Sequence, residues 1–264
     1  MHESATDTAR ISTLKSLVLR FIANSPSLKN VSVDKLEYVL AAPAGAGEVI
    51  SLFGGVTRQR PLVVIAGAEI IDALDSGAWY QACRPAIVTI PSFAEFVLVG
   101  PNLQFMDTGL LPLRAEQGYS PAVAAQSTLD TFIDDNEDLL PRIGLVILFQ
   151  PGMEAHYSNW FADDGEVFCR LLKAGAKIAV SSYDKAEAII DAQIIKAFGF
   201  GVGQIIENQF AYYFDTGAPV DSHFAHSVLC FDGSYPDKSF RPDLESISNM
   251  HVQYDGISPI DFLC

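Results

Sequence analysis

The stretch LVILFQPGMEAHYSNW, residues 145–160, decides the fold class of this protein. Its first five residues are all apolar, which is typical of a strand covered on both faces of a sheet. The apolar run ends in a Gln-Pro-Gly turn at residues 150–152, and a segment that carries Glu154 and His156 follows. We therefore predict a buried strand that passes through a tight turn into a helix.

Similar apolar runs, separated by helical patterns, occur on both sides of this stretch. Strands are predicted at residues 49–55, 61–69, 93–101, 127–132, 143–152, 177–183 and 204–214. Helices are predicted at residues 69–74, 134–140, 163–173 and 184–198. This alternation predicts an α/β fold with a mainly parallel, Rossmann-like or methyltransferase-like sheet in three layers, because each crossover places a helix on a sheet face.

The two ends of the chain differ from this core at residues 48–213. Residues 1–45 are predicted as a helical addition, with helices at residues 11–21 and 33–42 and a Pro/Gly/Ala connector after the second. Residues 214–264 are predicted to form an antiparallel edge strand, SVLCFDG, and a wrapping tail. The whole chain is expected to be one domain.

Charge and cysteine content exclude several classes of function. The 17 Lys and Arg residues stand against 32 Asp and Glu, a net charge of −15, which disfavours nucleic acid and anionic membranes as partners. The four cysteines form no C-x-x-C pair, so we predict neither a zinc site nor a disulfide framework. No stretch approaches the roughly 20 apolar residues of a membrane span, and no signal peptide is recognised. We expect a cytoplasmic protein without metal or cofactor, and the sequence assigns no oligomeric state.

The order of short motifs along the chain is distinctive. VVIAGAE, residues 63–69, is followed by FVLVGP at 96–101, ILFQPGM at 147–153, Trp160, and AVSSYDKAEAIIDAQII at 179–195. This order resembles the C-terminal domain of the mitochondrial splicing suppressor 51 family, found in many MYND zinc-finger proteins. The resemblance covers roughly residues 61–211.

The resemblance carries over residue by residue. The matching positions are Gly67, Ala68, Glu69, Gly100, Pro101, Pro151, Gly152, Trp160, Ser182, Tyr183, Glu187 and Asp191. Two features depart from the family pattern: Gln150 stands where the family usually has Asn, and the MYND zinc finger is absent. The resemblance implies a methyltransferase-like fold that acts in association with other proteins and has no established chemistry.

A ligand cleft is expected where the predicted parallel strands end. Ligands bind at the carboxyl ends of strands in open α/β sheets, and glycine there allows close approach. Tight strand-to-helix turns need glycine for their own geometry, so the same pattern has a purely structural explanation. The candidate cleft residues are Gly67, Glu69, Gly100, Pro101, Asp130, Gln150, Pro151, Gly152, Glu154, Trp160 and Tyr183.

Three other patterns favour structural explanations. The FGFGVGQ segment, residues 198–204, follows a predicted helix instead of a strand, so Gly199 is expected to cap that helix and not to bind a dinucleotide. His223 and His226 have unspecific spacing for a metal site. The acids at residues 134–138 suit a helix N-terminus, whereas Asp130, in a predicted apolar strand, is a candidate ligand contact.

Three functions remain open at this point. The first is a non-catalytic Rossmann-like interaction module that recognises an unidentified protein. The second is a binding protein or enzyme for a nucleotide-like or S-adenosylmethionine-like molecule in the strand-end cleft; however, the glycine-rich S-adenosylmethionine loop and its acidic strand end are missing. The third is an acidic antitoxin or immunity-type protein, which only the charge supports. Ser181, Ser182 and Cys169 are poor candidates for a catalytic nucleophile.

Overall fold

The computed structural model describes residues 13–25, 28–69, 72–84, 86–105, 122–214, 222–224, 227–237 and 239–251. The strands are β1 (Leu62–Ala66), β2 (Glu95–Val99), β3 (Val123–Ala125), β4 (Ile143–Phe149), β5 (Lys177–Ser182), β6 (Ile206–Glu207), β7 (Tyr212–Phe214), β8 (Ser222–Phe224) and β9 (Ser227–Cys230). The α-helices are α1 (Leu14–Asn24), α2 (Val33–Phe53), α3 (Trp79–Ala82), α5 (Leu129–Asp135), α6 (Met153–Trp160), α7 (Glu166–Lys173), α8 (Lys185–Ala197) and α9 (Leu244–His251). Short 3-10 helices are η2 (Asp75–Gly77), η3 (Glu137–Arg142) and η4 (Ala162–Gly165).

Seven strands form the main sheet in the order β3-β2-β1-β4-β5-β9-β6. The neighbours from β3 to β5 are parallel, whereas β9 is antiparallel to both β5 and β6. The strand order therefore reverses between β1 and β4, which is the topological switch point of a Rossmann-like sheet. The predicted class is confirmed: a mainly parallel, Rossmann-like α/β sheet with antiparallel strands from the C-terminal part of the chain.

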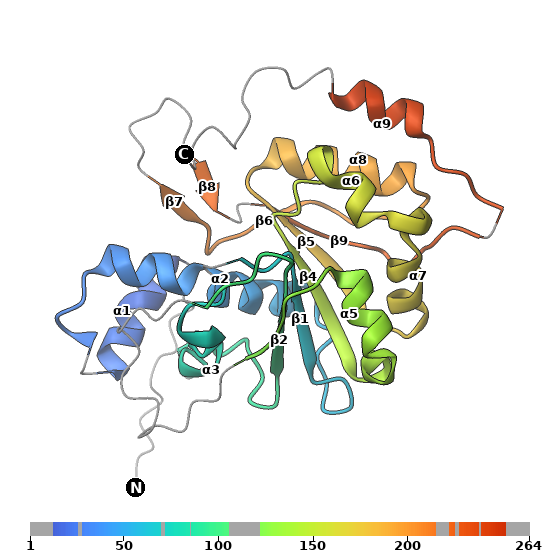
Figure 1. Ribbon diagram of the computed structural model, residues 1–264. Helices are drawn as coiled ribbons and strands as arrows, with labels where there is room; N and C mark the ends of the chain where they lie inside the picture. Colours follow the sequence, from blue (N-terminus) through green and yellow to red (C-terminus); the bar gives the residue numbers. More distant parts are fainter. Residues whose placement is uncertain are drawn as a thin grey trace, which may run out of the picture.

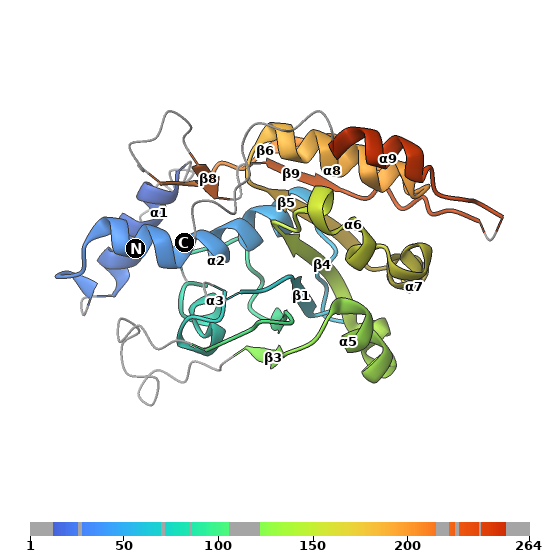
Figure 2. The ribbon, with the colours of Figure 1, turned by 45° about the horizontal axis from the view of Figure 1, so that its top comes forward.

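Helices cover both faces of the sheet, so its middle strands are buried on each side (Figures 1 and 2). On β4, Leu145, Ile147 and Phe149 face the core formed with α1, α2 and α3, and Val146 and Leu148 face the core formed with α5 to α8. All seven residues of β4 are buried. This double coverage explains the continuous apolar pattern of the strand.

Helix α2 corrects the sequence prediction most clearly. It runs unbroken from Val33 to Phe53 through Pro43, so the predicted connector after residue 42 and the predicted strand at 49–55 are wrong. Small residues let this helix pack closely: an ideal Cβ on Gly45 lies 3.5 Å from the Phe149 ring, and one on Gly47 lies 2.6 Å from Ile87. Tertiary packing thus outweighs the helix-breaking tendency of Pro and Gly.

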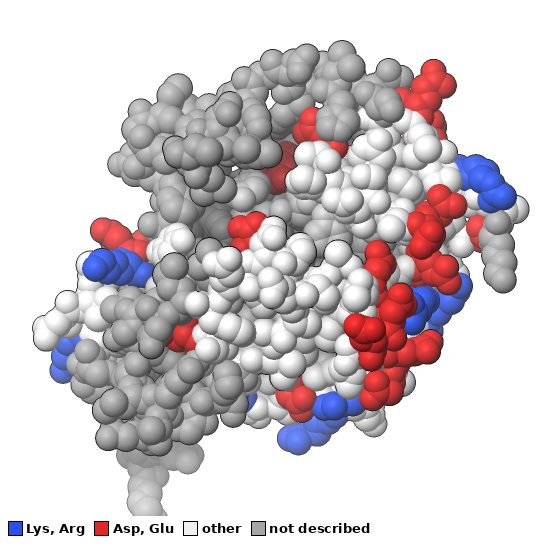
Figure 3. Space-filling model, viewed as in Figure 1, with Lys and Arg blue, Asp and Glu red and all other residues white. Residues whose placement is uncertain are grey.

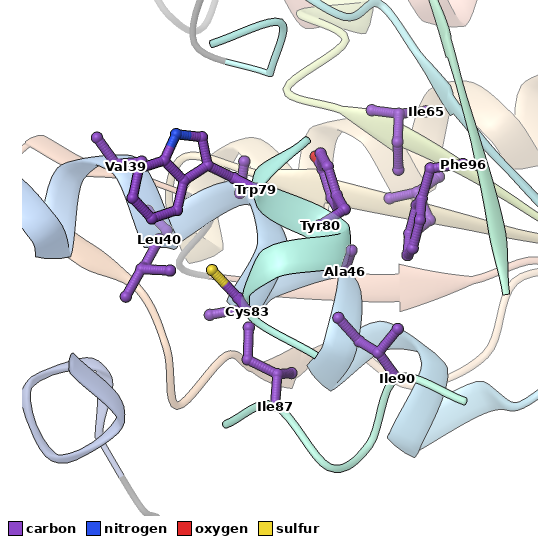
Figure 4. Close-up of a cluster of buried hydrophobic side chains, with 14 of the residues drawn as sticks. Val39, Leu40, Ala46, Ile65, Trp79, Tyr80, Cys83, Ile87, Ile90 and Phe96 are labelled. Carbon is purple, nitrogen blue, oxygen red and sulfur yellow. The ribbon is translucent and has the colours of Figure 1, made fainter. Parts of the chain in front are cut away.

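The same helix bears on the expectation that no stretch could span a membrane. By length and composition alone, Val33–Phe53 is long and apolar enough to do so, with a mean hydropathy of 1.3 over its most apolar window. In the structure 67% of that window is buried, and the helix forms one wall of the core shown in Figure 4. The apolar composition is therefore accounted for by burial inside the protein.

The segment at residues 127–132 is a helix start and not a strand. The Thr128 side chain accepts a hydrogen bond from the Thr131 backbone N–H and caps α5, which begins at Leu129. The strand of this region, β3, lies earlier, at Val123–Ala125. Asp130 is consequently in the first turn of α5, where a carboxylate is favoured by the helix dipole, and not within an apolar strand.

Other differences are smaller. The described part of residues 69–74 is a turn followed by η2 instead of a helix, and residues 204–214 contain two short strands, β6 and β7. Strand β9 is not the sheet edge, because β6 lies outside it. Thr6 and Asp7, expected to cap the first helix, lie outside the described residues; α1 begins after Thr13, which forms a capping box with Ser16.

Several local predictions are confirmed. Helix α8 begins after Asp184, whose side chain accepts a hydrogen bond from the Glu187 backbone N–H. It ends at Ala197, and Gly199 follows with a φ of +82°. The Gly199 N–H donates to the Lys196 carbonyl, so this glycine terminates a helix as predicted.

Candidate functional site

The sheet brings together the turns that follow β1, β2, β4 and β5. Because these four strands are parallel neighbours, their carboxyl ends lie along one edge and place Gly67, Gly100, Gln150 and Tyr183 near the switch point. The fold therefore places these four turns at one edge of the sheet. What each residue does there depends on its contacts.

The glycines and Trp160 mainly pack the protein's own turns together. Gly67 has a φ of +77°, and an ideal Cβ on it lies 3.3 Å from the Trp160 ring. The Trp160 Nε1–H donates to the Pro151 carbonyl oxygen at 2.8 Å. These contacts fix the turn after β1 against the turn after β4, so Gly67, Pro151 and Trp160 have structural roles.

The turns after β1 and β2 are also closed against each other. An ideal Cβ on Gly100 would lie 2.0 Å from the Ala68 carbonyl oxygen, and the Ala68 N–H donates to the Val99 carbonyl at 2.9 Å. Gly100 is therefore required by the close approach of two backbone segments of the same chain. Pro101 is exposed in the turn that follows.

Buried acids gather after β5. Asp191, on α8, has no exposed surface and accepts a hydrogen bond of 2.7 Å from the Ser182 hydroxyl. Burial raises the pKa of Asp191 to about 7, and the Met153 N–H at the start of α6 opposes this rise. Glu187 accepts a hydrogen bond from the Tyr183 backbone N–H, and burial followed by the charge of Asp191 raises the pKa of Glu187 to about 8.

A second acidic group follows β1. Asp72 accepts a hydrogen bond from the Glu69 backbone N–H at 3.0 Å and is 5% exposed. Burial raises the pKa of Asp72 to about 7, and the Tyr80 hydroxyl acts against this rise. The two acidic groups meet at Tyr183, because burial and then the charges of Glu187, Glu69 and Asp72 raise the pKa of Tyr183 to about 12.

Unpaired buried polar atoms concentrate at this edge of the sheet. Among the described residues, six buried side-chain nitrogen or oxygen atoms have no close hydrogen-bond partner. Three of the six lie at the ends of β4 and β5: Gln150 Nε2, the Ser181 hydroxyl and Oδ1 of Asp191, whose other carboxyl oxygen accepts from Ser182. Two more, Asp72 Oδ1 and the Tyr80 hydroxyl, lie next to each other between the segment after β1 and α3, where their interaction lowers the pKa of Asp72. Native proteins rarely leave such atoms unpaired, so these atoms are candidates for contact with water or with a ligand.

Gln150 is notable for its backbone as well. Its φ is +47°, in the left-handed region that residues other than glycine seldom adopt, and its N–H donates to the Ser181 carbonyl at 2.6 Å. The amide that sequence analysis singled out is therefore held in an unfavourable conformation at the switch point.

Two other predicted residues differ in their relation to this edge. The Glu154 charge raises the pKa values of Glu187 and Asp191, so Glu154 belongs with the acidic group after β5. Asp130 does not belong to this group. Burial and the charges of Asp134 and Asp163 raise the pKa of Asp130, and the charge of Arg170 lowers it; these three residues lie on or beside α5 and α7. The expectation that Asp130 contacts the cleft rested on the strand assignment that α5 corrects.

The possible metal site near His223 lies mostly beyond what the structure describes. Asp215, Asp221 and His226 are outside the described residues, as is the side chain of His223. Within the described ranges, no three His, Cys, Asp or Glu side chains are grouped so that they could hold a metal ion.

Sequence reasoning missed Asp72 and Tyr80 altogether and considered Ser181 only as a nucleophile. The acid in AEIID, residues 68–72, and the aromatic in AWYQ, residues 78–81, gave no signal that distinguishes them from surface and core residues. Glu187 and Asp191 were noticed only through the family resemblance. Their importance depends on burial, which the fold decides.

Several acidic side chains lie on the described surface around this region. Figure 3 shows them beside a hollow between the part of the molecule that carries α2 and the part that carries α6 and α8. The described charges with the largest effects on Asp72, Tyr183, Glu187 and Asp191 are all negative. The site is therefore unsuited to an anionic ligand.

Comparisons with known proteins add a likeness of fold. No protein-family model matches the chain, and no curated protein matches it in sequence. Among solved structures, the chain is similar to the precorrin-6y C5,15-methyltransferase from Geobacter metallireducens GS-15, with 7% identity and a TM-score of 0.35. The alignment covers 75% of this chain and 88% of that chain.

Proposed function

We propose that this protein binds a small molecule at the carboxyl ends of β1, β4 and β5. The observation that carries the proposal is the group of unpaired buried polar atoms at the ends of β4 and β5, which comprises Gln150 Nε2, the Ser181 hydroxyl and Asp191 Oδ1. Leaving a buried polar atom unpaired costs about 1–3 kcal/mol. A ligand that forms hydrogen bonds with several of these atoms removes that cost, and the recovered free energy favours its binding. Buried carboxyl groups with raised pKa values at the same place are also typical of ligand sites.

The contacts argue against a nucleotide or S-adenosylmethionine as that ligand. A dinucleotide needs room for its phosphates over the turn after the first strand, where backbone N–H groups bind them. Here Trp160 lies against Gly67, and Ala68 lies against Gly100. The surrounding acids would also repel phosphates. The proposal is therefore a binding site in a methyltransferase-like fold, with no methyl transfer assigned.

A thermal-shift screen tests this proposal. The purified protein is melted with a library of neutral, cationic and anionic metabolites, because a ligand that binds only the folded state raises Tm in a saturable way. We expect at least one class of compound to raise the Tm of the wild type. The same compound should raise the Tm of Gln150→Leu by less, because this variant lacks the unpaired amide.

A matched control is Glu137→Gln, an exposed position on η3 away from the strand ends. This variant should retain the full ligand-induced shift. If no class of compound raises Tm, or if the Gln150 and Glu137 variants respond alike, the proposed site is wrong.

A second function, recognition of a basic protein, is favoured by a separate surface. We define the acidic row as the exposed residues Asp134, Asp135, Glu137, Asp138 and Glu166. Figure 3 shows acidic side chains along the edge of the molecule that Figure 1 assigns to α5 and α7. Asp134 and Asp135 end α5, where the helix dipole disfavours acids, so the expected explanation by a helix N-terminus does not hold for them.

The resemblance to the mitochondrial splicing suppressor 51 family supports this second function as a proposal. Its motifs fall at strand ends: Gly67 follows β1, Gly100 follows β2, and Ser182 ends β5. The resemblance implies association with other proteins. We expect the wild type to bind a Lys-rich peptide. The double variant Asp135→Lys, Glu137→Lys should lose this binding, whereas the control variant Glu154→Gln should retain it. Equal binding by the double variant and the control would contradict this second function.

A further inference from the structure

We propose that the Trp160 side chain is a gate over the strand-end site, which we define as the carboxyl ends of β1, β4 and β5, and that the backbone of Gln150 is coupled to its opening. This role rests on the proposed function, because it concerns the access of a small molecule to that same site. Ligands of open α/β sheets bind beside the switch point, which here lies between β1 and β4. In this structure the Trp160 ring lies against the turn after β1 at that point.

The Trp160 side chain contacts both turns that border the switch point. An ideal Cβ on Gly67, after β1, lies 3.3 Å from the Trp160 ring and 3.5 Å from the Phe149 carbonyl oxygen at the end of β4. The Trp160 Nε1–H donates to the Pro151 carbonyl oxygen at 2.8 Å. Between Phe149 and Pro151 stands Gln150, whose Nε2 is buried without a hydrogen-bond partner. The ring therefore closes the switch point next to the residue that supplies the unpaired amide.

The Trp160 ring can move while the helix that carries it stays in place. The next residue, Phe161, is 3% exposed and stacks on Phe198 with ring centroids 4.2 Å apart, so it anchors the end of α6. Trp160 is only partly buried, and the single N–H of its indole ties it to the Pro151 carbonyl. A neutral hydrogen bond of this kind contributes little net free energy, because water can replace the partner. Rotation of the side chain is therefore sufficient to open the gate.

Strain in the turn after β4 favours this opening. Gln150 has a φ of +47°, and Gly152 follows with a φ of +53°. Residues other than glycine keep such a conformation only where surrounding contacts hold them in it. The hydrogen bond from Trp160 to Pro151 is one of these contacts, and its net free energy is similar in size to the strain of one left-handed residue. The closed and open positions are therefore close in free energy, as a gate requires.

Hydrogen exchange of the indole N–H groups measures the opening directly. The sequence has two tryptophans, so protein with isotope-labelled tryptophan gives two indole N–H signals in NMR spectra, which the variant Trp160→Phe assigns. Trp79 is the internal reference, because it is 2% exposed and its Nε1–H donates to Asp75. We expect the Trp160 N–H to exchange at least about 100-fold faster than the Trp79 N–H, at a rate that sub-denaturing urea does not change.

Gln150→Gly tests the coupling between the turn and the gate. Glycine adopts a φ of +47° without strain, so the closed position is stabilised and exchange of the Trp160 N–H should slow about fivefold or more. Ser76→Gly is the matched control. Ser76 has a φ of +58°, but its backbone bonds to Ala73 and Ala122 and not to the turn that Trp160 holds. This variant removes a similar strain elsewhere and should change the Trp160 exchange rate less than about twofold.

Slower exchange in Gln150→Gly together with an unchanged rate in Ser76→Gly supports the gate. Equal effects of the two variants, or a Trp160 N–H as protected as that of Trp79, would show that Trp160 is a fixed part of the fold and would overturn the proposal.

These measurements use no ligand, so their outcome is independent of the thermal-shift screen. If the screen finds a rise in Tm that depends on Gln150 while Trp160 stays closed, the gate is wrong and the proposed function stands. If Trp160 opens but no compound raises Tm, the proposed function is wrong and Trp160 has no site to close.

Discussion

The Ser182 hydroxyl at the end of β5 donates a hydrogen bond of 2.7 Å to Asp191 on α8, and both side chains are fully buried. Asp191 also faces the Met153 N–H, so one carboxyl group joins a strand end, the start of α6 and the middle of α8. Helix α6 begins at Gly152, which supplies no side-chain cap of its own. The Asp191 carboxyl, on α8, thus accepts from a backbone N–H at the start of α6, for which α6 has no side-chain cap of its own.

This arrangement predicts that stability falls as pH rises. The pKa of Asp191 is raised from 3.8 to about 7 and that of Glu187 from 4.5 to about 8, so the folded state holds protons that the unfolded state has released. Stability should decrease through this window and become constant above about pH 8. Asp184, Glu154 and Tyr183 face the pair and supply no compensating positive charge.

Asp191→Asn tests the effect by urea unfolding between pH 5 and pH 8. At pH 8 the variant should be more stable than wild type by about 2 kcal/mol, and at pH 5 the two should be similar. Asp134→Asn, an exposed change, should leave the wild-type pH dependence intact. A wild type that becomes more stable as pH rises from 5 to 8 would contradict the prediction.

Gln150→Gly is predicted to stabilise the protein. The φ of +47° costs a residue with a Cβ about 1–2 kcal/mol, and glycine avoids that cost together with the unpaired amide. After allowance for the greater freedom of glycine in the unfolded chain, a gain of about 1 kcal/mol is expected. The measurement is the free energy of unfolding in urea.

Gln150→Asn serves as the matched variant, since Asn tolerates this backbone region better than Gln and keeps an amide. It should gain less than the glycine variant. Loss of stability in Gln150→Gly would show that the side chain contributes to folding and would remove the argument that it is retained for binding.

Gly100→Ala is predicted to be severely destabilising. A Cβ at this position would lie 2.0 Å from the Ala68 carbonyl oxygen, and neither backbone segment can move without breaking the ends of β1 and β2. The expected loss is about 3 kcal/mol or more. Gly203→Ala is the control, because Gly203 has no positive φ and the added Cβ would meet only the Cys230 carbonyl oxygen at 3.4 Å, so this variant should lose less than about 1 kcal/mol. Thermal or urea unfolding compares the two, and equal losses would refute the close contact.

Arg60→Met is predicted to lower stability by about 1–3 kcal/mol. The Arg60 guanidinium donates to the Ile143 carbonyl at 3.1 Å and to the Ala174 carbonyl, joining the starts of β4 and β5. The methionine keeps the apolar stem and leaves both carbonyls unpaired. Arg142→Met is the control. It breaks only the ion pair between Arg142 and Glu95, and because both side chains are about half exposed, the free energy of unfolding should fall by less than about 0.5 kcal/mol. Denaturant titrations that rank the two variants in the opposite order would contradict this assignment.

The strand-end site was predictable in outline only. Gln150, Glu154 and Tyr183 were identified in advance because they follow apolar runs, and the parallel sheet places them at one edge. Asp72 and Tyr80 were not, because an acid and an aromatic residue acquire their roles through burial next to each other. The strand assigned around Asp130 was wrong, because a short apolar run does not distinguish a strand from the start of a helix.

The sequence by itself determined the fold class and the position of the central strands. The continuous apolar runs of β1 and β4 can be buried completely only when both faces of a sheet are covered, and this is a property of each segment taken alone. Helix α2 and the buried acids were decided only by the tertiary structure. Packing against Phe149 and Ile87 holds the Pro- and Gly-containing helix together, and burial between α8 and the end of β5 raises the pKa of Asp191; both effects depend on neighbours distant in the chain.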